Sequence, residues 1–222
     1  MTTVGFIGSG MIGGTVARLS VAAGYQVVLS NSRGPETLKD LVEELGPLAS
    51  AATSEEAAAA EDLVVVSVPL HACPHLPAGA LAGRTVLDTG NYYPQRDSQI
   101  PELESGALTS SAWLQQQLPG AEVVKVFNNI FFKHLRSLAR PSGAADRTYL
   151  PIAGDDAAAK AAVTEFLDSI GYGAVDAGTL AESWRQEPGT PVYGAPYGPF
   201  EDEAGHPASA DVIRAALAGA TR

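Results

Sequence analysis

The sequence predicts an α/β protein with a Rossmann-type, doubly wound and mostly parallel sheet and a small C-terminal α/β extension. Two observations predict this fold class. Residues 4–13, VGFIGSGMIG, place a short apolar run before a Gly-x-Gly-x-x-Gly turn and a helical stretch. Beyond them, apolar runs typical of buried strands alternate with helical stretches as far as about residue 127, which is the pattern of successive βαβ units.

The glycines of this turn each have a physical role in a dinucleotide site. We expect Gly8 to permit the tight turn, Gly10 to let the backbone approach a pyrophosphate, and Gly13 to let the helix lie close to the strand. Free N–H groups at the start of the helix, together with the helix dipole, would bind the anion. Because glycine clusters also form ordinary turns, the alternative is a structural turn in an unrelated α/β protein.

The end of the second strand indicates which dinucleotide binds. A helix over residues 11–23 and a strand over residues 25–31 are expected to follow the glycines. NAD sites usually carry Asp or Glu at the end of that strand, to bind the ribose hydroxyls, whereas this chain has Asn31, Ser32 and Arg33. A hydroxyl and a guanidinium suit a phosphate dianion, so we expect selectivity for NADP. The alternative is that Arg33 is a solvated turn residue.

Composition and charge exclude several classes of protein. The chain has 222 residues, enough for one or two domains, and its formal net charge of −11 argues against a nucleic-acid or anionic-membrane partner. The single cysteine, Cys73, excludes an internal disulfide and fits a reducing compartment. The first strand begins at once, without a basic leader, and no long apolar span follows, so we expect a cytoplasmic protein.

The next segments continue the alternation of helix and strand. Pro35 suits the first turn of a helix, whose apolar residues repeat at helical spacing until Gly46. Residues 48–53 predict a short third strand. Ser54 is the expected N-cap of an alanine-rich helix over residues 55–60.

Three later strands end in polar residues at one edge of the predicted sheet. The run 63–68 is typical of a central parallel strand, and strands over 85–88 and 122–127 follow it. Ligands bind at the carboxyl ends of strands in such sheets. The candidate binding residues at this edge are Ser67, Val68, Pro69, Asn91, Asn128 and Asn129. The asparagine amides would bind ribose or a carboxamide; the alternative is that they only satisfy backbone groups of the loops.

The remaining segments are predicted from caps, apolar faces and breakers. We expect a helix capped by Ser110 or Ser111 and ending at Gln117, a helix over 130–139, an edge strand over 148–153 that contains Pro151, a helix capped by Asp155 or Asp156, and a last strand over 174–176. Residues 186–207 are rich in Pro and Gly and contain Tyr193, Tyr197 and Phe200. They predict a long loop, packed across the cleft or against a partner subunit, before a final helix over 209–218.

Few side chains are suited to acid–base chemistry. The Tyr-x-x-x-Lys pattern of short-chain dehydrogenases is absent. Lys125 is a candidate general acid, although pairing with a carboxylate fits a strand lysine equally well, and His71 and Asn128 are further catalytic candidates. This scarcity favours a redox cofactor as hydride partner, because such a partner brings its own electronics and needs mainly face-to-face positioning. A flavin or deazaflavin is therefore expected rather than a simple ketone.

A histidine- and cysteine-containing run raises the question of a metal. His71, Cys73 and His75 occupy alternating positions, but a metal site needs three or four ligands at suitable geometry. The other histidines, His134 and His206, stand alone in the sequence. We therefore expect no metal site, and His71 is expected to border the cleft.

Five motifs stand in order along the chain. They are Gly8-Ser9-Gly10-Met11-Ile12-Gly13, Asn31-Ser32-Arg33, Val124-Lys125-Val126-Phe127-Asn128-Asn129-Ile130, Ile152-Ala153-Gly154-Asp155-Asp156 followed by Lys160, and Val175-Asp176-Ala177-Gly178 before Leu180. Together they resemble the coenzyme F-420-dependent NADP oxidoreductases, a deazaflavin-linked family. The motifs span about residues 4–185, and the ordered set is more specific than the first motif alone.

The resemblance implies a Rossmann domain over residues 1–127, a smaller C-terminal domain over 128–222, and commonly a homodimer. It also implies NADP(H) in the cleft with its nicotinamide stacked on a deazaflavin, coenzyme F-420. By the same resemblance, the pyrophosphate loop includes Ser9, Met11 and Ile12, and the 2′-phosphate site includes Asn31, Ser32, Arg33 and Thr37. Thr37 stands near the place where the family often has a further basic residue. The segment WRQEP at 184–188 is similar to a bacterial subgroup whose second substrate varies.

Three functions are open on the sequence alone. The first is a reductase that moves a hydride between NADP(H) and a deazaflavin. The second is an NADPH-dependent reductase of a flavin, quinone, imine or other small electrophile. The third is an NADPH-binding sensor without turnover, whose Pro/Gly-rich loop contacts a partner.

Overall fold

The computed structural model describes residues 2–60 and 63–222. Its strands are β1 (Thr3–Ile7), β2 (Gln26–Ser30), β3 (Ala49–Ala51), β4 (Leu63–Val66), β5 (Thr85–Asp88), β6 (Glu122–Lys125), β7 (Tyr149–Gly154) and β8 (Gly173–Asp176). The described strands form one sheet in the order β3-β2-β1-β4-β5-β6-β7-β8. Pairing is parallel throughout except between β6 and β7. The order of the first six strands is that of a doubly wound dinucleotide-binding sheet, so the predicted fold class is confirmed.

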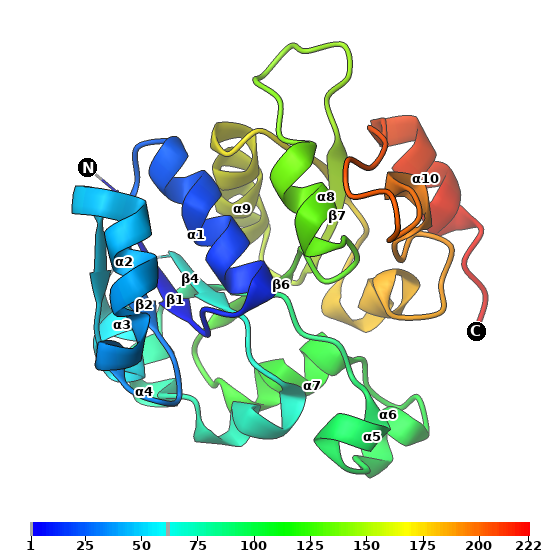
Figure 1. The fold of residues 1–222 in the computed structure, drawn as a ribbon. Coiled ribbons are helices and arrows are strands. Elements are labelled where there is room, and N and C mark those ends of the chain that lie inside the picture. Colours follow the sequence, from blue (N-terminus) through cyan, green and yellow to red (C-terminus); the bar gives the residue numbers. More distant parts are fainter. Residues whose placement is uncertain (1, 61–62) are drawn as a thin grey trace.

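Helices connect the strands and cover both faces of the sheet (Figure 1). The α-helices are α1 (Met11–Ala22), α2 (Lys39–Leu45), α3 (Ser54–Ala59), α4 (Ala78–Leu81), α5 (Pro94–Asp97), α6 (Pro101–Glu104), α7 (Ser110–Gln117), α8 (Phe132–Ser137), α9 (Ala157–Ser169) and α10 (Ala210–Ala218). The 3-10 helices are η1 (Pro35–Leu38), η2 (Gly46–Leu48), η3 (Leu70–His75), η4 (Leu180–Gln186) and η5 (Ala195–Tyr197). Among the described helices, none is both long and apolar enough to cross a membrane.

Two apolar cores lie on opposite faces of the sheet. Successive side chains of a strand point to opposite faces, and β4 shows the consequence. Val65 belongs to the core under α1 and α9, whereas Val64 and Val66 belong to the core under α3, α4 and α7. Figure 1 shows the same two helical layers above and below the sheet. A strand buried on both faces explains the continuous apolar run that the sequence shows there.

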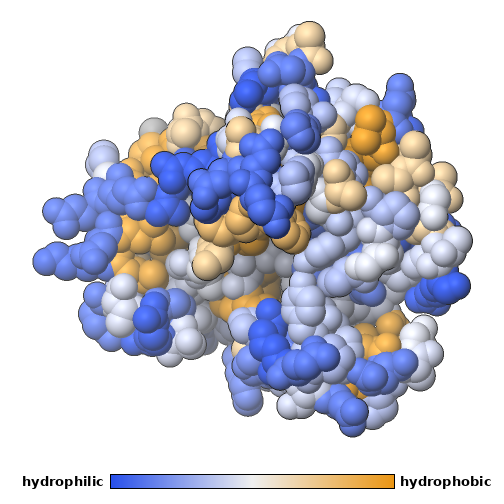
Figure 2. Space-filling model, turned by 45° about the vertical axis from the view of Figure 1, so that its right-hand side comes forward, coloured by the Kyte–Doolittle hydropathy of each residue, from blue (hydrophilic) through white to orange (hydrophobic). Residues whose placement is uncertain are grey.

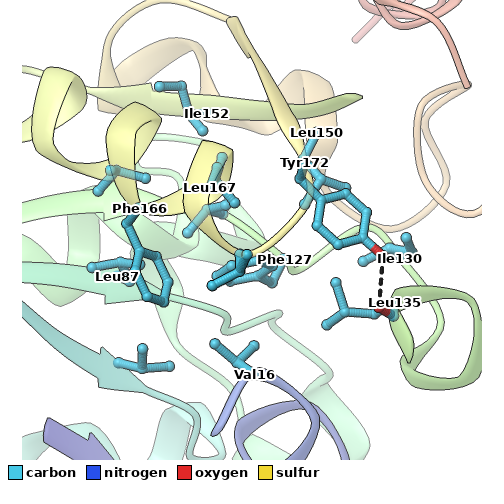
Figure 3. Close-up of a cluster of buried hydrophobic side chains, with 14 of the residues drawn as sticks. Val16, Leu87, Phe127, Ile130, Leu135, Leu150, Ile152, Phe166, Leu167 and Tyr172 are labelled. Carbon is cyan, nitrogen blue, oxygen red and sulfur yellow. Dashed lines mark hydrogen bonds between the residues drawn. The ribbon is translucent and has the colours of Figure 1, made fainter. Parts of the chain in front are cut away.

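The larger core joins the C-terminal extension to the first sheet strands. Figure 3 shows Phe166 and Leu167 of α9 packed near Leu87 of β5 and Val16 of α1. In the same cluster the Tyr172 hydroxyl donates a hydrogen bond of 2.6 Å to the carbonyl oxygen of Leu135. The extension therefore shares this apolar core with the dinucleotide-type sheet, and a domain division between residues 127 and 128 stays a prediction.

The glycine turn, Gly8 to Gly13, has the geometry that its sequence requires. Gly8 has a φ of +98°, and a Cβ there would lie 2.2 Å from the carbonyl oxygen of Ser67. A Cβ on Gly13 would lie 2.1 Å from the carbonyl oxygen of Gly8. Only glycine accepts such close approach of backbone. At Gly10, by contrast, a Cβ would meet nothing within 4 Å.

Two of the expected helix N-caps are wrong, and in each the cap lies earlier in the chain. The N-cap of α3 is Thr53 rather than Ser54, because Thr53 and Glu56 form a reciprocal capping box. The N-cap of α7 is Thr109, whose hydroxyl accepts from the Ala112 N–H, rather than Ser110 or Ser111. The N-cap of α9 is Asp156, one of the two expected residues, and its side chain accepts from the Ala159 N–H.

The seventh strand is not at the edge of the sheet, contrary to the expectation from its proline. Strand β7 lies between β6 and β8, and Pro151 is opposite Val175 of β8. Within β7, the residues that pair with β6 are Ala153 and Gly154. The proline therefore lies in the part of β7 that has no β6 neighbour, where its missing N–H costs no ladder hydrogen bond.

Substitutions at Gly13 and Gly10 are expected to differ in their effect on stability, because a Cβ is blocked at Gly13 and unobstructed at Gly10. Gly13→Ala pushes a methyl group into the Gly8 carbonyl, so we expect its free energy of unfolding to fall by ~1–3 kcal/mol. Gly10→Leu meets no protein atoms at its Cβ, so we expect its stability to stay close to that of the wild type. Urea unfolding followed by circular dichroism measures both. Equal losses in the two variants would contradict this interpretation of the turn.

Candidate functional site

A cleft with a volume of about 360 Å³ opens at the carboxyl edge of the sheet. It is lined by Met11, Ile12, Ser67, Val68, Pro69, Thr89, Gly90, Asn91, Tyr93, Arg96, Phe127, Asn128, Asn129, Ile130, Phe131, Phe132, Tyr193, Gly194 and Phe200. Figure 2 shows hydrophobic side chains within the hollowed surface and hydrophilic ones around it. A volume of a few hundred Å³ with a mainly apolar lining is typical of small-molecule sites.

Eight of the binding residues predicted from the sequence meet in this cleft. They are Met11, Ile12, Ser67, Val68, Pro69, Asn91, Asn128 and Asn129. They follow β1, β4, β5 and β6, whose parallel arrangement brings their carboxyl ends to one edge. This is the place where open α/β sheets bind ligands. Whether these residues bind a cofactor stays a prediction.

The glycine turn and the end of β2 lie side by side along the same edge. The Gly8 N–H and the Ser9 hydroxyl both donate to the carbonyl oxygen of Ser30, at 3.0 Å. The Ser30 hydroxyl in turn donates to the Phe6 carbonyl oxygen at 2.8 Å. These bonds tie the first turn to the second strand. The predicted pyrophosphate loop and the predicted 2′-phosphate turn are thus neighbours in space.

The turn after β2 is built by its own side chains. The Asn31 Oδ1 accepts from the Arg33 N–H at 2.9 Å, and the Asn31 Nδ2 donates to the Thr37 hydroxyl at 2.8 Å. That hydroxyl donates to the Gly34 carbonyl oxygen at 2.8 Å. Ser32 and Arg33 are exposed, and the described part of the chain provides no hydrogen bond to the Arg33 guanidinium. Asn31 and Thr37 shape the turn, while Ser32 and Arg33 face solvent.

The asparagines after β5 and β6 hold the two loops together. The Asn91 Nδ2 donates to the Asn128 carbonyl oxygen at 2.8 Å, and the Asn128 Nδ2 donates to the Asn91 Oδ1 at 3.0 Å. The Asn128 Nδ2 also donates to the carbonyl oxygen of Gln186 at 2.7 Å. Preceding them, Phe127 has a φ of +63°, a left-handed conformation that is costly for a bulky residue. This turn ends β6 two residues earlier than expected.

Lys125 lies beneath the cleft rather than in its lining. Its Nζ is buried and donates to the Gly90 carbonyl oxygen at 3.0 Å and to the hydroxyls of Ser110 and Ser111 at 2.8 and 3.0 Å. The Nζ lies 3.9 Å from the Asp88 carboxylate. The geometry matches a strand lysine paired with a carboxylate. The hydroxyls that were expected to cap α7 are engaged with this charged pair.

His71 also lies outside the cleft lining. Its Nδ1 lies 3.2 Å from the Asp97 carboxylate, whose other partner is the Arg96 guanidinium at 2.7 Å. Burial acts to raise the pKa of Asp97, but hydrogen bonds from Arg96, the Tyr93 N–H and His71 together lower it to about 2. Arg96 itself lines the cleft. The cluster therefore fixes the wall of the cleft, with His71 behind it.

Aromatic side chains form much of the cleft, and of these the sequence indicated only those of the loop over residues 186–207, as one of two alternatives. They are Tyr93, Phe127, Phe131, Phe132, Tyr193 and Phe200. Phe131 packs against both Phe132 and Phe200, with ring centroids 4.7 and 5.2 Å apart. Two of these residues, Tyr193 and Phe200, come from the loop over residues 186–207. The aromatic content of that loop was the available signal, and of its two expected positions the structure shows the one across the cleft.

The histidine and cysteine run forms the 3-10 helix η3. Cys73 is buried, and its Sγ lies 3.9 Å from the Pro69 carbonyl oxygen. Desolvation raises the pKa of the Cys73 thiol. The described residues contain no group of three or more His, Cys, Asp or Glu side chains that could hold a metal ion.

Comparison with known proteins adds the family. A family model described as "NADP oxidoreductase coenzyme F420-dependent" matches residues 3–92. A provisionally assigned F420-dependent NADP reductase from Arthrobacter sp. FB24 has a TM-score of 0.69 and 25% identity, over 83% of this chain and 87% of that chain. Residues 3–92 of this chain therefore belong to this NADP oxidoreductase family.

Two further relatives differ in how much of their own length this chain covers. The structure of the hypothetical protein SMa0349 from Sinorhizobium meliloti has a TM-score of 0.74 and 31% identity, over 86% of this chain and 93% of that chain. The metalloreductase STEAP3 of Rattus norvegicus is 30% identical over 186 residues, which are 83% of this chain and 35% of STEAP3. The chain spans little more than a third of the length of the curated relatives that it matches.

The hydrogen bonds that Asp97 accepts from Arg96, His71 and the Tyr93 N–H are expected to stabilise the fold at neutral pH and to lose this contribution in acid. Because the pKa of Asp97 is lowered to about 2, its contribution is present above the unfolded pKa of about 4 and is lost as the pH falls toward 2. At neutral pH we expect Asp97→Asn to lower the free energy of unfolding by roughly 1–2 kcal/mol. Urea unfolding between pH 7 and pH 2 should show this difference shrinking below about pH 4.

Asp211→Asn is the matched control, because that carboxylate is exposed and, among the described residues, its ion-pair partner is Arg214 three residues away. We expect its stability to stay within about 0.5 kcal/mol of the wild type at neutral pH. A difference between Asp97→Asn and the wild type that stays constant down to pH 2 would contradict the assignment of the low pKa.

Proposed function

We propose that this chain transfers a hydride between NADP(H) and a deazaflavin of the coenzyme F-420 type. The family supplies the general class, an NADP-dependent oxidoreductase. The observation that carries the choice of acceptor is the aromatic cleft at the carboxyl edge of the sheet. The position, lining and electrostatics of this cleft support the proposal.

The glycine turn fits the pyrophosphate of a dinucleotide. Gly10 is the N-cap of α1, and no side chain caps the first N–H groups of this helix. The Cβ position of Gly10 is open, so an anion could approach the backbone there. The first turn of α1 has no acidic residue that would repel it. Helix N-termini with these properties bind phosphate groups readily.

The second-strand turn supports NADP over NAD. It presents the exposed Ser32 and Arg33 next to the glycine turn. Asn31 occupies the position at which NAD sites usually carry a carboxylate. A guanidinium without a protein partner can bind a phosphate at little cost in broken contacts.

The cleft supports a planar redox partner. A bound nicotinamide would supply or accept the hydride, and the chain would hold the second ring against it. The aromatic walls provide stacking surface. The ionisable side chains in the lining are Tyr93, Tyr193 and Arg96, and the Arg96 guanidinium is paired with Asp97. Lys125 and His71, the candidate acids, lie outside the lining. Positioning rather than acid–base assistance is what such a cleft offers.

The test is stopped-flow absorbance of the purified protein with NADPH and oxidised coenzyme F-420, with riboflavin and FMN as controls. We expect rapid bleaching of the deazaflavin that saturates in both substrates. Reduction of a flavin, quinone or imine without reduction of F-420 would identify the second candidate function. Binding of NADPH without reduction of any acceptor would identify a sensor. Size-exclusion chromatography with light scattering in the same buffer tests the expected homodimer.

Arg33→Ala tests the cofactor assignment. We expect the Kd for NADPH to rise about 10-fold to 100-fold, because a charge-assisted contact to phosphate is lost. The Kd for NADH should change by less than about 2-fold, since NADH lacks that phosphate. Isothermal titration calorimetry measures both.

Lys39→Ala is the matched control for Arg33→Ala. Lys39 is another exposed cation, at the start of α2, so its removal changes the net charge equally. We expect it to leave the ratio of the two Kd values nearly unchanged. Equal weakening of NADPH and NADH by Arg33→Ala would contradict the phosphate-binding role.

A further inference from the structure

We propose that the paired hydroxyl groups of Tyr93 and Tyr193 donate a hydrogen bond to a polar acceptor atom on the ring of the second substrate. The inference rests on the proposed function, because it concerns the ring that would occupy the same cleft. It adds a substrate-positioning group and a chemical requirement on the ring.

The two tyrosines come from two different loops at the cleft. Tyr93 lies in the loop that follows β5, directly before α5, and Tyr193 lies in the loop over residues 186–207. Both line the cleft, and their hydroxyl oxygens are 2.7 Å apart. Residues one hundred positions apart in the sequence therefore form one polar group within a mainly apolar lining.

The pair has one hydrogen-bond donor to spare. Two phenols carry two protons, and the bond between them uses one. In the described ranges, 2–60 and 63–222, neither hydroxyl makes a further hydrogen bond. One O–H group is thus available to a bound molecule, whichever tyrosine donates to the other.

Both phenols are held in place before any ligand arrives. The Tyr93 N–H donates to the Asp97 carboxylate at 3.0 Å, and the Arg96 guanidinium lies 4.9 Å from the centre of the Tyr93 ring. In the other loop, the Tyr193 N–H donates to the Thr190 carbonyl oxygen at 3.0 Å. A donor fixed in this way loses little freedom on binding, so its contact contributes more to affinity and orientation.

Burial disfavours the ionised form of Tyr193. Desolvation, together with the hydrogen bond to Tyr93, raises the pKa of Tyr193 above its usual value. The pair therefore acts as a donor and not as a base near neutral pH. Its complement is a carbonyl oxygen or an unprotonated ring nitrogen. A planar ring that carries such an atom at its edge would satisfy the O–H, whereas a hydrocarbon ring would bury it unpaired.

The test is the double substitution Tyr93→Phe with Tyr193→Phe, which removes only the two oxygens. Oxidised F-420 and FMN are each titrated into protein saturated with NADP⁺, and the absorbance shift of the ring is recorded. We expect the Kd of the bound ring to rise about 10-fold to 100-fold, the range expected when the acceptor atom of the buried ring loses its donor. The Kd of NADPH should stay within about 2-fold. Each single substitution leaves one unpaired O–H, so we expect a smaller effect.

Tyr92→Phe is the matched control. Tyr92 belongs to the same loop, and its hydroxyl donates to Glu104 at 2.6 Å, but the residue does not line the cleft. We expect ring binding within about 2-fold of the wild type. Thermal unfolding of every variant shows that the chain is folded. A merely structural role for the pair would change the melting temperature without the shift in ring affinity.

The outcomes separate this inference from the proposed function. A double variant that is folded and binds the ring as the wild type does would overturn the inference and leave the proposed function intact. A wild-type protein that binds and reduces FMN but not F-420 would overturn the deazaflavin assignment, while the same variants measured with FMN still decide the tyrosine pair. A wild-type protein that binds neither ring would overturn both.

Discussion

The buried ammonium group of Lys125 joins β5, β6 and α7 beneath the floor of the cleft. The register of the two strands places Lys125 opposite Asp88, and the Nζ donates to Ser110, Ser111 and the Gly90 carbonyl oxygen. Asp88 also accepts from the Gly90 N–H at 2.8 Å. A buried charge is tolerated only when such partners surround it, because its desolvation costs several kcal/mol. The cleft wall that begins at Gly90 is therefore fixed by this network.

The features that could be predicted from the sequence depend on short-range chemistry. The turn at Gly8 and Gly13 follows from backbone approach that leaves no room for a Cβ, and this constraint is visible in the spacing of the glycines. The central strands follow from apolar runs, and the topology then places their carboxyl ends together. The position of Arg33 in an exposed turn follows from the Asn31 side chain two residues earlier. Each of these needs only neighbouring residues and a known sheet order.

The features that could not be predicted depend on contacts between distant residues. Thr109, Ser110 and Ser111 have similar capping chemistry, and the choice among them is made by Lys125 and by the Leu180 carbonyl oxygen that accepts from Thr109. The loop over residues 186–207 lacks regular structure of any length, as expected. Its place over the cleft is set by Asn129, which donates to the Val192 carbonyl oxygen and accepts from the Gly194 N–H. No local pattern encodes those partners.

The polar groups around the cleft are mostly committed to its walls. Asn128 is bound to Asn91 and Gln186, and Arg96 is bound to Asp97. What remains toward the cavity is aromatic surface, the side chains of Ser67 and Thr89, and one donor of the tyrosine pair. If a planar ring occupies it as proposed, such a site would discriminate by shape, stacking and hydrogen bonding rather than by charge. On the proposed function, the redox chemistry resides in the two bound rings. The chain then contributes their alignment, and the strained turn at Phe127 is part of the structure that maintains it.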